Sequence, residues 1–303
     1  MNVKKQRQSK LTSLKDAAAL VQDGDRIAIG GFGVYQHPMA FVYELIRQKK
    51  KELTVVGIVN GNDVDILTGA GCLARVETSY VGFEKFGLAP NFRRAVEAGE
   101  LRIVDYPEIL SMDRFRASQE NFSFWPAYFL GGNDLLRINP DIKPFNCPLT
   151  GKKAWAVPPA DPDVVVIHAT LGDEYGNVLV PSRRLTPQSL DITLARSCDK
   201  VIVTVEKIVS TQKIRRHPHL VEIPSYRTTA VVEAPWGAHP TSMLGVYGGD
   251  DEHVQAYLRA AKSPEDFRKY LDEYVYGVDG HMEYLDKIGL ETLLRLRKMD
   301  IAL

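Results

Sequence analysis

The sequence is poor in cysteine and has no excess of charge of either sign. Only three cysteines occur in 303 residues, Cys72, Cys147 and Cys198, and they lie far apart. No CxxC pair and no Cys/His pair at zinc spacing is present, which argues against a zinc module and a disulfide framework. Lys plus Arg and Asp plus Glu each number 38, so the formal charge is zero. This balance gives no electrostatic footprint for nucleic acid or an anionic membrane.

Long apolar runs are also absent. No run approaches the roughly 20 residues that a membrane-spanning helix needs. The first ten residues carry charge but are not followed by the apolar core of a secretory signal. The seven histidines form no metal-binding pattern. We therefore expect a protein of the reducing cytoplasm that binds no metal and inserts in no membrane.

What the sequence does contain is an alternation of short apolar, β-branched runs with helical patterns. Strands are predicted at residues 26–29, 53–59, 76–83, 101–104, 154–157, 164–167, 201–205 and 229–232. Helices are predicted at residues 12–21, 39–47, 64–69, 91–98, 108–119 and 191–197. Repeated strand–loop–helix units indicate an α/β protein with an open, mainly parallel sheet and helices on both faces. Ligands of such sheets bind at the carboxyl ends of the strands.

The chain shows no internal repeat and no break in composition, so we expect a single domain over residues 1–303. Residues 122–152 are rich in Gly, Pro, Asn and aromatics and have no clear period. They are interpreted as a long loop or excursion. Residues 252–303 have a helical pattern, with a helix start signal at Ser263 and Pro264. This segment is expected to form a cap or a subunit interface.

The sharpest local pattern is the glycine-rich turn after the first predicted strand. The strand runs into Gly30-Gly31-Phe32-Gly33, and Pro38 begins the next helix. Glycines let the backbone approach a ligand closely, and free N–H groups there can hold a carboxylate or an oxyanion. A tight strand-to-helix turn is the alternative explanation. The pattern is neither GxGxxG nor a phosphate loop, so nucleotide binding is not indicated.

This turn resembles the first subunit of the family I coenzyme A transferases. That family has an acidic residue or Asn, a glycine, a short apolar strand, Gly-Gly-Phe and then a proline, and here Asp23, Gly24, residues 30–32 and Pro38 fit. Many ketoacid transferases have a glycine where this chain has Gln36, so a small ketoacid substrate is less expected. The resemblance is closer to glutaconate CoA-transferase alpha subunits. The segments that carry it are 38–41, 44–48, 53–54, 167–169, 206–210, 214–218, 234–240, 265–267 and 283–289.

The resemblance implies a specific mechanism. Such enzymes have two kinds of subunit, each with an open α/β sheet of the NagB-RpiA-like type, and an active site at their interface. A glutamate on the beta chain attacks the acyl-CoA thioester, and an anhydride and then a glutamyl-CoA thioester follow. The Ser-Glu-Asn-Gly nucleophile motif of the ketoacid group is missing from this chain. We therefore expect a beta-subunit partner, coenzyme A as a substrate with no permanently bound cofactor, and a dicarboxylic or bulky acyl-CoA.

The site residues follow from the same resemblance. The loop with Gly30, Gly31, Phe32, Gly33, Gln36 and His37 is expected to supply oxyanion donors, and Gln36 or His37 a contact to a distal acid group. Two further strand-end candidates are Asn60 with Gly61 and Ser79 with Tyr80. A helix cap or a turn is the alternative explanation for each of these loops, because Asn, Asp and Gly are favoured there whatever the function.

Glu108 has two interpretations. It lies where a related branch, actinobacterial hydrolases that open a CoA-linked steroid-derived ring, uses a glutamate of the first subunit. It also follows Pro107 in the first turn of a predicted helix, where the helix dipole favours an acid. Three functions thus remain open: a CoA-transferase subunit, a CoA-linked ring-opening hydrolase or decarboxylase, and a non-catalytic subunit that binds acyl-CoA.

Overall fold

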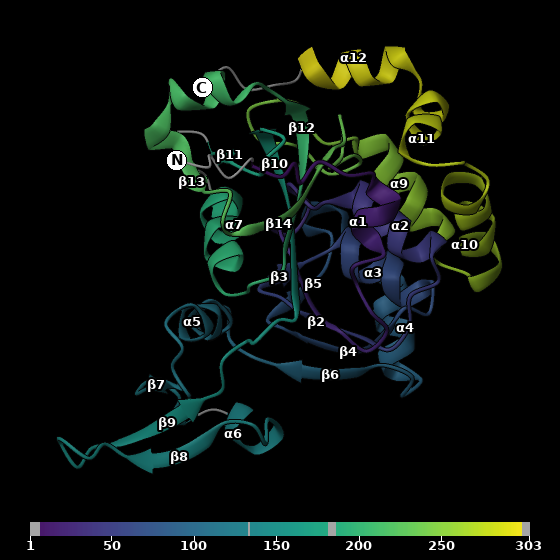
Figure 1. The fold of residues 1–303 in the computed structure, drawn as a ribbon. Coiled ribbons are helices and arrows are strands. Elements are labelled where there is room, and N and C mark those ends of the chain that lie inside the picture. Colours follow the sequence, from purple (N-terminus) through teal and green to yellow (C-terminus); the bar gives the residue numbers. More distant parts are fainter. Residues whose placement is uncertain (1–6, 133, 181–185, 299–303) are drawn as a thin grey trace, which may run out of the picture.

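A central sheet of nine strands organises the chain, and it is mainly parallel (Figure 1). The computed structural model describes residues 7–132, 134–180 and 186–298. Seven parallel strands lie in the order β14-β12-β10-β1-β2-β4-β6. They are β1 (Arg26–Ile29), β2 (Leu53–Val56), β4 (Leu73–Thr78), β6 (Arg102–Asp105), β10 (Val164–Gly172), β12 (Val201–Ile208) and β14 (Thr228–Glu233). The short strands β11 (Val178–Leu179) and β13 (Val221–Ile223) extend it in antiparallel fashion beside β10.

Helices cover both faces of this sheet, as the alternating pattern predicted. One face carries α1 (Leu14–Ala18), α2 (Met39–Arg47), α3 (Asn62–Gly69) and α4 (Pro90–Glu97), and the other α5 (Glu108–Gln119) and α7 (Thr186–Arg196) (Figure 1). Within β1, Ile27 and Ile29 belong to the core of the first face, and Ala28 to that of the second. A strand buried on both sides needs apolar residues at every position, which is why 164–167 is an unbroken apolar run.

The order of the strands reverses between β1 and β10. The chain adds β2, β4 and β6 on one side of β1, then returns to add β10, β12 and β14 on the other side. Loops that leave two such neighbouring strands diverge, and the crevice between them is where open α/β sheets bind ligands. The glycine-rich turn after β1 therefore lies at this reversal point.

Two predicted strands are shorter than the sequence indicated. The apolar run 53–59 leaves the sheet after Val56, and β3 (Val59–Asn60) pairs instead with β5 (Tyr80–Val81). The run 76–83 divides in the same way after Thr78. Polar contacts explain the breaks, because the Thr78 hydroxyl donates to the Ile58 carbonyl at 3.0 Å and to Asn60 Oδ1 at 2.8 Å. A β-branched composition does not reveal such a bend.

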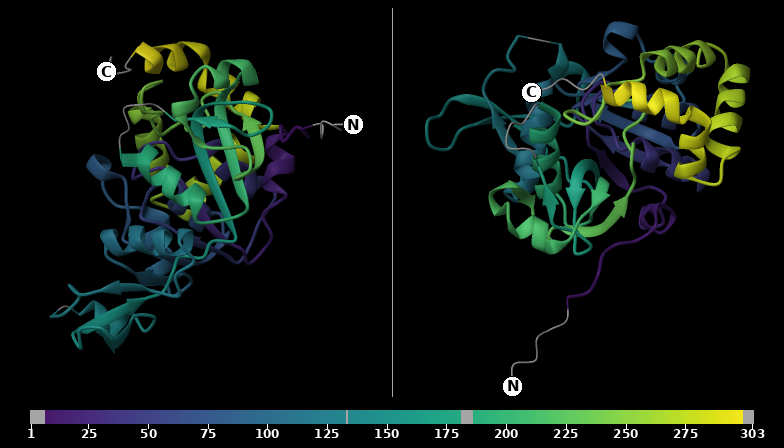
Figure 2. Two further views of the ribbon diagram at one scale, coloured as in Figure 1. Left: turned by 60° about the vertical axis from the view of Figure 1, so that its left-hand side comes forward. Right: turned by 90° about the horizontal axis from the view of Figure 1, so that it is seen from above.

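The predicted loop at 122–152 is wrong in one respect, because it holds regular structure. It contains β7 (Trp125–Ala127), α6 (Leu135–Ile138) and β8 (Lys143–Asn146). With β9 (Lys153–Val157) the strands form a separate antiparallel sheet in the order β7-β9-β8. The predicted strand 154–157 thus belongs to this small sheet and not to the main one. Figure 2 shows the excursion extending away from the main sheet.

The C-terminal segment is helical, as predicted, over its described part to residue 298. It comprises α9 (Asp251–Ala260), α10 (Pro264–Leu271), a π-helical turn at Asp272–Tyr276, α11 (His281–Ile288) and α12 (Leu290–Lys298). The Ser263 hydroxyl accepts from the Asp266 N–H and caps α10. Buried residues of these helices join the core of the α2 and α3 face, so the segment packs on that side of the molecule.

Short elements complete the chain. They are the helix α8 (Thr211–Arg215) and two 3-10 turns at Glu84–Phe86 and Pro218–Leu220. None of the helices in the described ranges is long and apolar enough to cross a membrane.

Candidate functional site

A pocket of about 560 Å³ opens at the carboxyl ends of the strands on the β1-to-β6 side of the sheet. We call it the strand-end pocket. It is lined by Phe32, Val59, Ser79, Tyr80, Glu84, Asp105, Tyr106, Pro107, Glu108 and Leu135. Four of the residues singled out in the sequence, Phe32, Ser79, Tyr80 and Glu108, therefore meet in one place. They meet because each follows a parallel strand whose carboxyl end lies at the same edge of the sheet.

Ser79 and Tyr80 form the wall above β4. The Ser79 hydroxyl donates to the Ile58 carbonyl, so it ties two strand ends together. Tyr80 is 38% exposed and lines the opening. A Cβ at Gly82 would lie 2.4 Å from the Tyr80 hydroxyl oxygen, so the glycine is what lets the phenol ring fold back over the chain.

Three carboxyl groups, from Glu84, Asp105 and Glu108, line the strand-end pocket. Partial burial raises the pKa of Asp105. No Lys, Arg or His belongs to the described lining. Among the described residues, moreover, no group of three or more His, Cys, Asp or Glu side chains is arranged to hold a metal ion. The walls that this chain contributes are thus acidic and aromatic.

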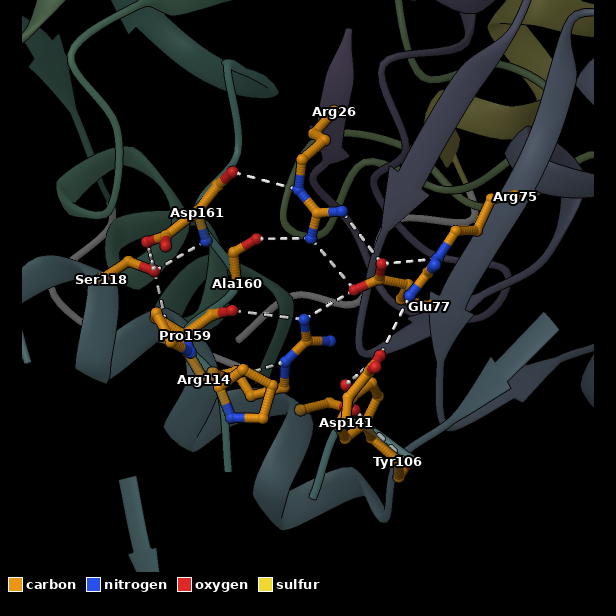
Figure 3. Close-up of polar contacts among 12 residues, drawn as sticks. Arg26, Arg75, Glu77, Tyr106, Arg114, Ser118, Asp141, Pro159, Ala160 and Asp161 are labelled. Carbon is orange, nitrogen blue, oxygen red and sulfur yellow. Dashed lines mark hydrogen bonds and ion pairs between the residues drawn. The ribbon is translucent and has the colours of Figure 1, made fainter. Parts of the chain in front are cut away.

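Glu108 is the first residue of α5, and a buried cluster of charges holds this helix in place (Figure 3). At its centre is Glu77 of β4, whose side chain is 2% exposed. Arg26 binds both carboxylate oxygens at 3.0 Å, Arg75 binds one at 2.8 Å, and Arg114 of α5 binds the other at 2.6 Å. Burial alone would raise the pKa of Glu77, but Arg26 and Arg114 lower it to about 2. We call this group the Glu77 cluster.

The Glu77 cluster reaches the strand-end pocket through Arg114. The Arg114 guanidinium lies over the ring of Tyr106, 3.9 Å from its centre, and Tyr106 lines the pocket. It also donates to the Pro158 carbonyl at 3.1 Å. On the other side Arg75 pairs with Asp141 of the excursion at 3.1 Å. The cluster thus fixes α5, and with it Glu108, against β4 and the small sheet.

The glycine-rich loop differs from its expected role as an oxyanion hole. We expected free N–H groups in residues 30–36, but six of them donate to acceptors inside the chain. The pairs are Gly30 to Val166 O (2.8 Å), Gly31 to Asp191 Oδ1 (2.9 Å), Phe32 to Tyr35 O (2.8 Å), Gly33 to Val59 O (3.0 Å), Tyr35 to Phe32 O (3.0 Å) and Gln36 to Ser242 O (2.7 Å). For these six groups the prediction is wrong in the chain on its own, because oxygens of the turn and of neighbouring segments already accept their hydrogen bonds.

Gln36 and His37 also lie elsewhere than expected. Both side chains are buried, and neither lines the strand-end pocket. His37 Nε2 lies 3.0 Å from the Gly33 carbonyl oxygen, and Gln36 Nε2 donates to Asp191 Oδ2 at 2.9 Å. The structure therefore gives no support to the expectation that they meet a distal acid group of a substrate.

Asn60 and Gly61 have structural roles next to Val59, and neither of them lines the strand-end pocket. Asn60 is buried and donates to Asp63 Oδ2 at 2.7 Å, and the Gly61 N–H donates to Asp63 Oδ1 at 2.8 Å. A Cβ at Gly61 would lie 2.2 Å from the Gly33 carbonyl oxygen. Gly61 is thus needed for the close approach of two loops, which fits the alternative explanation of a turn.

Sequence reasoning missed Asp191. The prediction placed it at the start of a helix, whereas α7 begins at Thr186 and Asp191 lies in its middle, facing the glycine-rich loop. Burial raises the pKa of its carboxyl group to about 7. The signal available in the sequence was a single acid between two apolar residues, Leu190 and Ile192, on a helix that had to pack against the sheet.

Comparison with known proteins gives concordant matches. A family model described as Coenzyme A transferase matches residues 11–234. The A subunit of glutaconate CoA-transferase from Acidaminococcus fermentans is 33% identical, over 95% of this chain and 95% of its own length. The A subunit of 3-oxoadipate CoA-transferase from Pseudomonas knackmussii is 34% identical, over 93% and 99%. A cholesterol ring-cleaving hydrolase IpdA subunit of Rhodococcus jostii is 30% identical, over 89% and 93%.

Solved structures agree. The crystal structure of glutaconate coenzyme A-transferase from Acidaminococcus fermentans matches with a TM-score of 0.90 and 33% identity, covering 95% of this chain and 96% of that chain. A variant of the decarboxylase AibA/AibB matches with a TM-score of 0.77 and 31% identity, covering 88% and 100%. The fold, the glycine-rich turn and these matches together show that the chain belongs to the coenzyme A transferase family, as a protein of the alpha-subunit type.

Proposed function

We propose that this chain is the alpha subunit of a CoA-transferase that exchanges CoA between an acyl-CoA and a carboxylic acid. The observation that carries the proposal is the strand-end pocket, open at the carboxyl ends of the sheet, in a chain whose relatives at 33% and 34% identity are named as the A subunits of CoA-transferases. An A subunit implies a second subunit, and we assign the nucleophilic glutamate to that partner.

The chemistry divides between the two chains. A carboxylate of the partner attacks the thioester carbonyl carbon, the C–S bond breaks, and CoA leaves as a thiolate, so that a mixed anhydride of the acyl group and the glutamate remains. The thiolate then attacks the glutamyl carbonyl, which releases the acyl group as a carboxylate and leaves a glutamyl-CoA thioester. An acceptor acid reverses both steps. Phe32, Val59 and Leu135 give this chain's wall of the pocket an apolar surface against which an acyl chain can lie.

A second candidate function is a CoA-linked hydrolase or decarboxylase on the same scaffold. The observation that favours it is Glu108, an exposed carboxyl group on the pocket wall that the transfer mechanism does not use. As a general base Glu108 would activate a water molecule in a hydrolase, a contribution of typically 10²–10⁴-fold in rate. The relatives named as a ring-cleaving hydrolase and as a decarboxylase agree with this candidate as well.

Co-expression with a candidate second subunit, taken from the neighbouring gene, separates these functions. The purified complex is given acetyl-CoA and glutaconate, and CoA exchange and release of free thiol are measured in parallel. Transfer predicts that exchange exceeds thiol release. Thiol release without exchange would contradict it, and binding of acyl-CoA without either reaction would indicate a non-catalytic subunit.

The substitution Glu108→Gln separates the transferase from the hydrolase by a second measurement. If the complex is a hydrolase that uses Glu108, the substitution lowers thiol release by about 10²–10⁴-fold. If it is a transferase, we expect a change in exchange of less than about tenfold, because the nucleophile lies on the other chain. Glu84→Gln is the matched control, since Glu84 is another carboxyl group of the same pocket.

A further inference from the structure

The carboxyl group of Asp191 joins α7 to the glycine-rich loop, residues 30–36. One of its oxygens accepts the Gly31 N–H at 2.9 Å and the other accepts the side-chain amide of Gln36 at 2.9 Å. The same Gln36 nitrogen lies 3.3 Å from the His168 carbonyl oxygen of β10. Asp191 is buried. Two donors of the loop therefore depend on one carboxyl group.

The loop is shaped around this contact. A Cβ at Gly30 would lie 2.5 Å from Asp191 Oδ1, closer than side-chain atoms approach one another. Gly31 has a φ of +96°, and a Cβ there would lie 2.7 Å from the Tyr35 carbonyl oxygen. The glycine pair is thus required by the approach of Asp191 and by the tight turn behind it. Phe32, which follows directly, lines the strand-end pocket.

Asp191 does not itself meet a substrate in this arrangement. It lines a separate, narrow space of about 10 Å³ with Gln36, His168, Thr170 and Gln188, and apolar side chains make up the rest. This volume is about that of a single water molecule, so an acyl group does not fit. Asp191 therefore acts from behind the loop, on the side away from the strand-end pocket.

We propose that Asp191 is a positioning residue for the strand-end pocket, because its carboxyl group holds the glycine-rich loop in the shape that presents Phe32 to the substrate. The effect on turnover rests on the proposed function, whereas the effect on the loop does not. Misplacing a group that positions a substrate by about 1 Å can cost on the order of 100-fold in rate. The loss of the two hydrogen bonds is therefore expected to affect catalysis more than stability.

The protonation state of Asp191 provides a readout that a purely structural contact would lack. Burial raises its pKa to about 7, and no charged group of the described ranges contributes to the shift. The other titratable group on this space, among the described residues, is His168, whose Nε2 lies 2.7 Å from Glu206 Oε1. The carboxylate form makes charge-assisted bonds to Gly31 and Gln36, which are stronger than the bonds of the neutral acid. The loop is thus held more firmly above about pH 7 than below it.

A hydrogen-bond acceptor is also available to the protonated form of Asp191. The side-chain oxygen of Gln36 is buried and has no hydrogen-bond partner within the described part of the chain. When Asp191 is protonated, its O–H can donate to this oxygen once the Gln36 amide rotates. The neutral and ionised forms of Asp191 therefore favour different orientations of Gln36, and the loop that carries Gln36 changes with them.

The sign of the stability effect separates this role from simple support of the fold. The unfolded chain loses the proton of this acid at about pH 4, whereas the folded chain keeps it until about pH 7. The free energy of unfolding therefore decreases as the pH rises from about 4 to about 7. Asp191→Asn removes that decrease. At pH 8 we expect the urea midpoint of the variant to lie close to that of the wild type, while its turnover falls.

The experiment uses the complex with the second subunit. We expect Asp191→Asn to lower kcat/KM about 10-fold to 100-fold at pH 8 and to remove an inflection near pH 7 from the pH profile of kcat/KM. Gln36→Met removes one of the two donors and keeps a similar shape, so it should lower kcat/KM by a smaller factor. This variant replaces Asp191→Asn in the test if Asp191→Asn does not assemble with the second subunit. Asp65→Asn is the control, since Asp65 is a buried acid with a pKa raised to about 6, bonded to Tyr257 away from the loop.

Amide hydrogen exchange of residues 30–36 is measured in the same samples. We expect the amides of this loop to exchange faster in Asp191→Asn than in the wild type. In the wild type, we expect faster exchange at pH 6 than at pH 8 after correction for the intrinsic rate. Unchanged kcat/KM, pH profile and loop exchange in Asp191→Asn would overturn the proposal, as would an equal loss in Asp65→Asn. A wild-type complex without turnover would count against the proposed function, and loop exchange would still decide the role of Asp191.

Discussion

At the residue scale, Gly31 is where conformation and packing constrain the site most. Its φ of +96° lies in the left-handed region, and a Cβ would lie 2.7 Å from the His37 nitrogens and the Tyr35 carbonyl oxygen. A side chain therefore meets backbone atoms of the same turn, which have no room to move away. The turn has to open before any other residue fits.

Gly31→Val is accordingly expected to lower the free energy of unfolding by at least 1–3 kcal/mol (an order-of-magnitude figure for a strained φ) and turnover of the complex by more than tenfold, by displacing Phe32. Gly24→Ala is the matched control, because Gly24 also has a positive φ, +86°, but open space where its Cβ would be. Urea unfolding at pH 7 and CoA exchange measure the two effects. Full turnover in a correctly assembled Gly31→Val complex would instead indicate that the loop is passive.

Among the predicted site residues, those that the sequence places at or shortly after the end of a strand come to line the strand-end pocket. Phe32, Ser79 and Tyr80 come at strand ends, and parallel strands bring their carboxyl ends to one edge. The direction of a side chain is a different matter. Gln36 and His37 belong to the same loop as Phe32, yet their side chains turn into the protein, because the positive φ values of the turn redirect the chain. No spacing rule contains that information.

At the scale of elements, the Glu77 cluster decides where α5 sits. Glu77→Gln would leave the guanidinium groups of Arg26, Arg75 and Arg114 without their shared carboxylate. Breaking a buried ion pair on one side typically costs about 3–5 kcal/mol. We expect a loss of this size in urea unfolding at pH 7. Glu97→Gln, which breaks an exposed pair with Arg93, should cost less than about 1 kcal/mol.

The pH dependence of the cluster follows from the same contacts. The pKa of Glu77 is lowered to about 2 in the folded chain, against about 4.3 when unfolded. Its stabilisation, on the order of 3 kcal/mol, is therefore fully present above about pH 4.3 and is lost as the pH falls towards 2. The difference in stability between wild type and Glu77→Gln should shrink over this interval. A difference that stays constant from pH 5 to pH 2 would show that the carboxylate charge is not what matters.

The excursion shows why some elements could not be predicted. Its outer strands β7 and β8 each contain a proline, Pro126 and Pro144, and proline is tolerated in a sheet at edge strands. The central strand β9 contains none, and it was the one strand of this sheet that the sequence indicated. A proline-rich, aromatic segment without alternation therefore predicted a loop, although pairing with β9 makes it a sheet.

At the scale of the whole molecule, charge limits what this chain can do alone. Its formal charge is zero, and the described lining of the strand-end pocket has three carboxyl groups and no cation. Coenzyme A carries several phosphate charges, which such a wall repels rather than attracts. The cations that bind CoA must therefore lie elsewhere on this chain or on the second subunit. The pocket is also open to solvent, which agrees with the proposed second subunit as the chain that excludes water from it.

The purified chain alone is therefore expected to fold but not to turn over acyl-CoA. Its urea unfolding should be cooperative, because both faces of its sheet carry buried cores, whereas acetyl-CoA with glutaconate should give neither exchange nor free thiol. Adding the second subunit should restore exchange and tighten binding of CoA, measured by calorimetry. A matched mixture of the second subunit with the Gly31→Val chain tests whether restoration needs an intact loop and not only assembly. Turnover by the single chain at the rate of the complex would place the nucleophile on this chain, and the carboxyl groups of Glu108, Glu84 and Asp105 would then be the first to test.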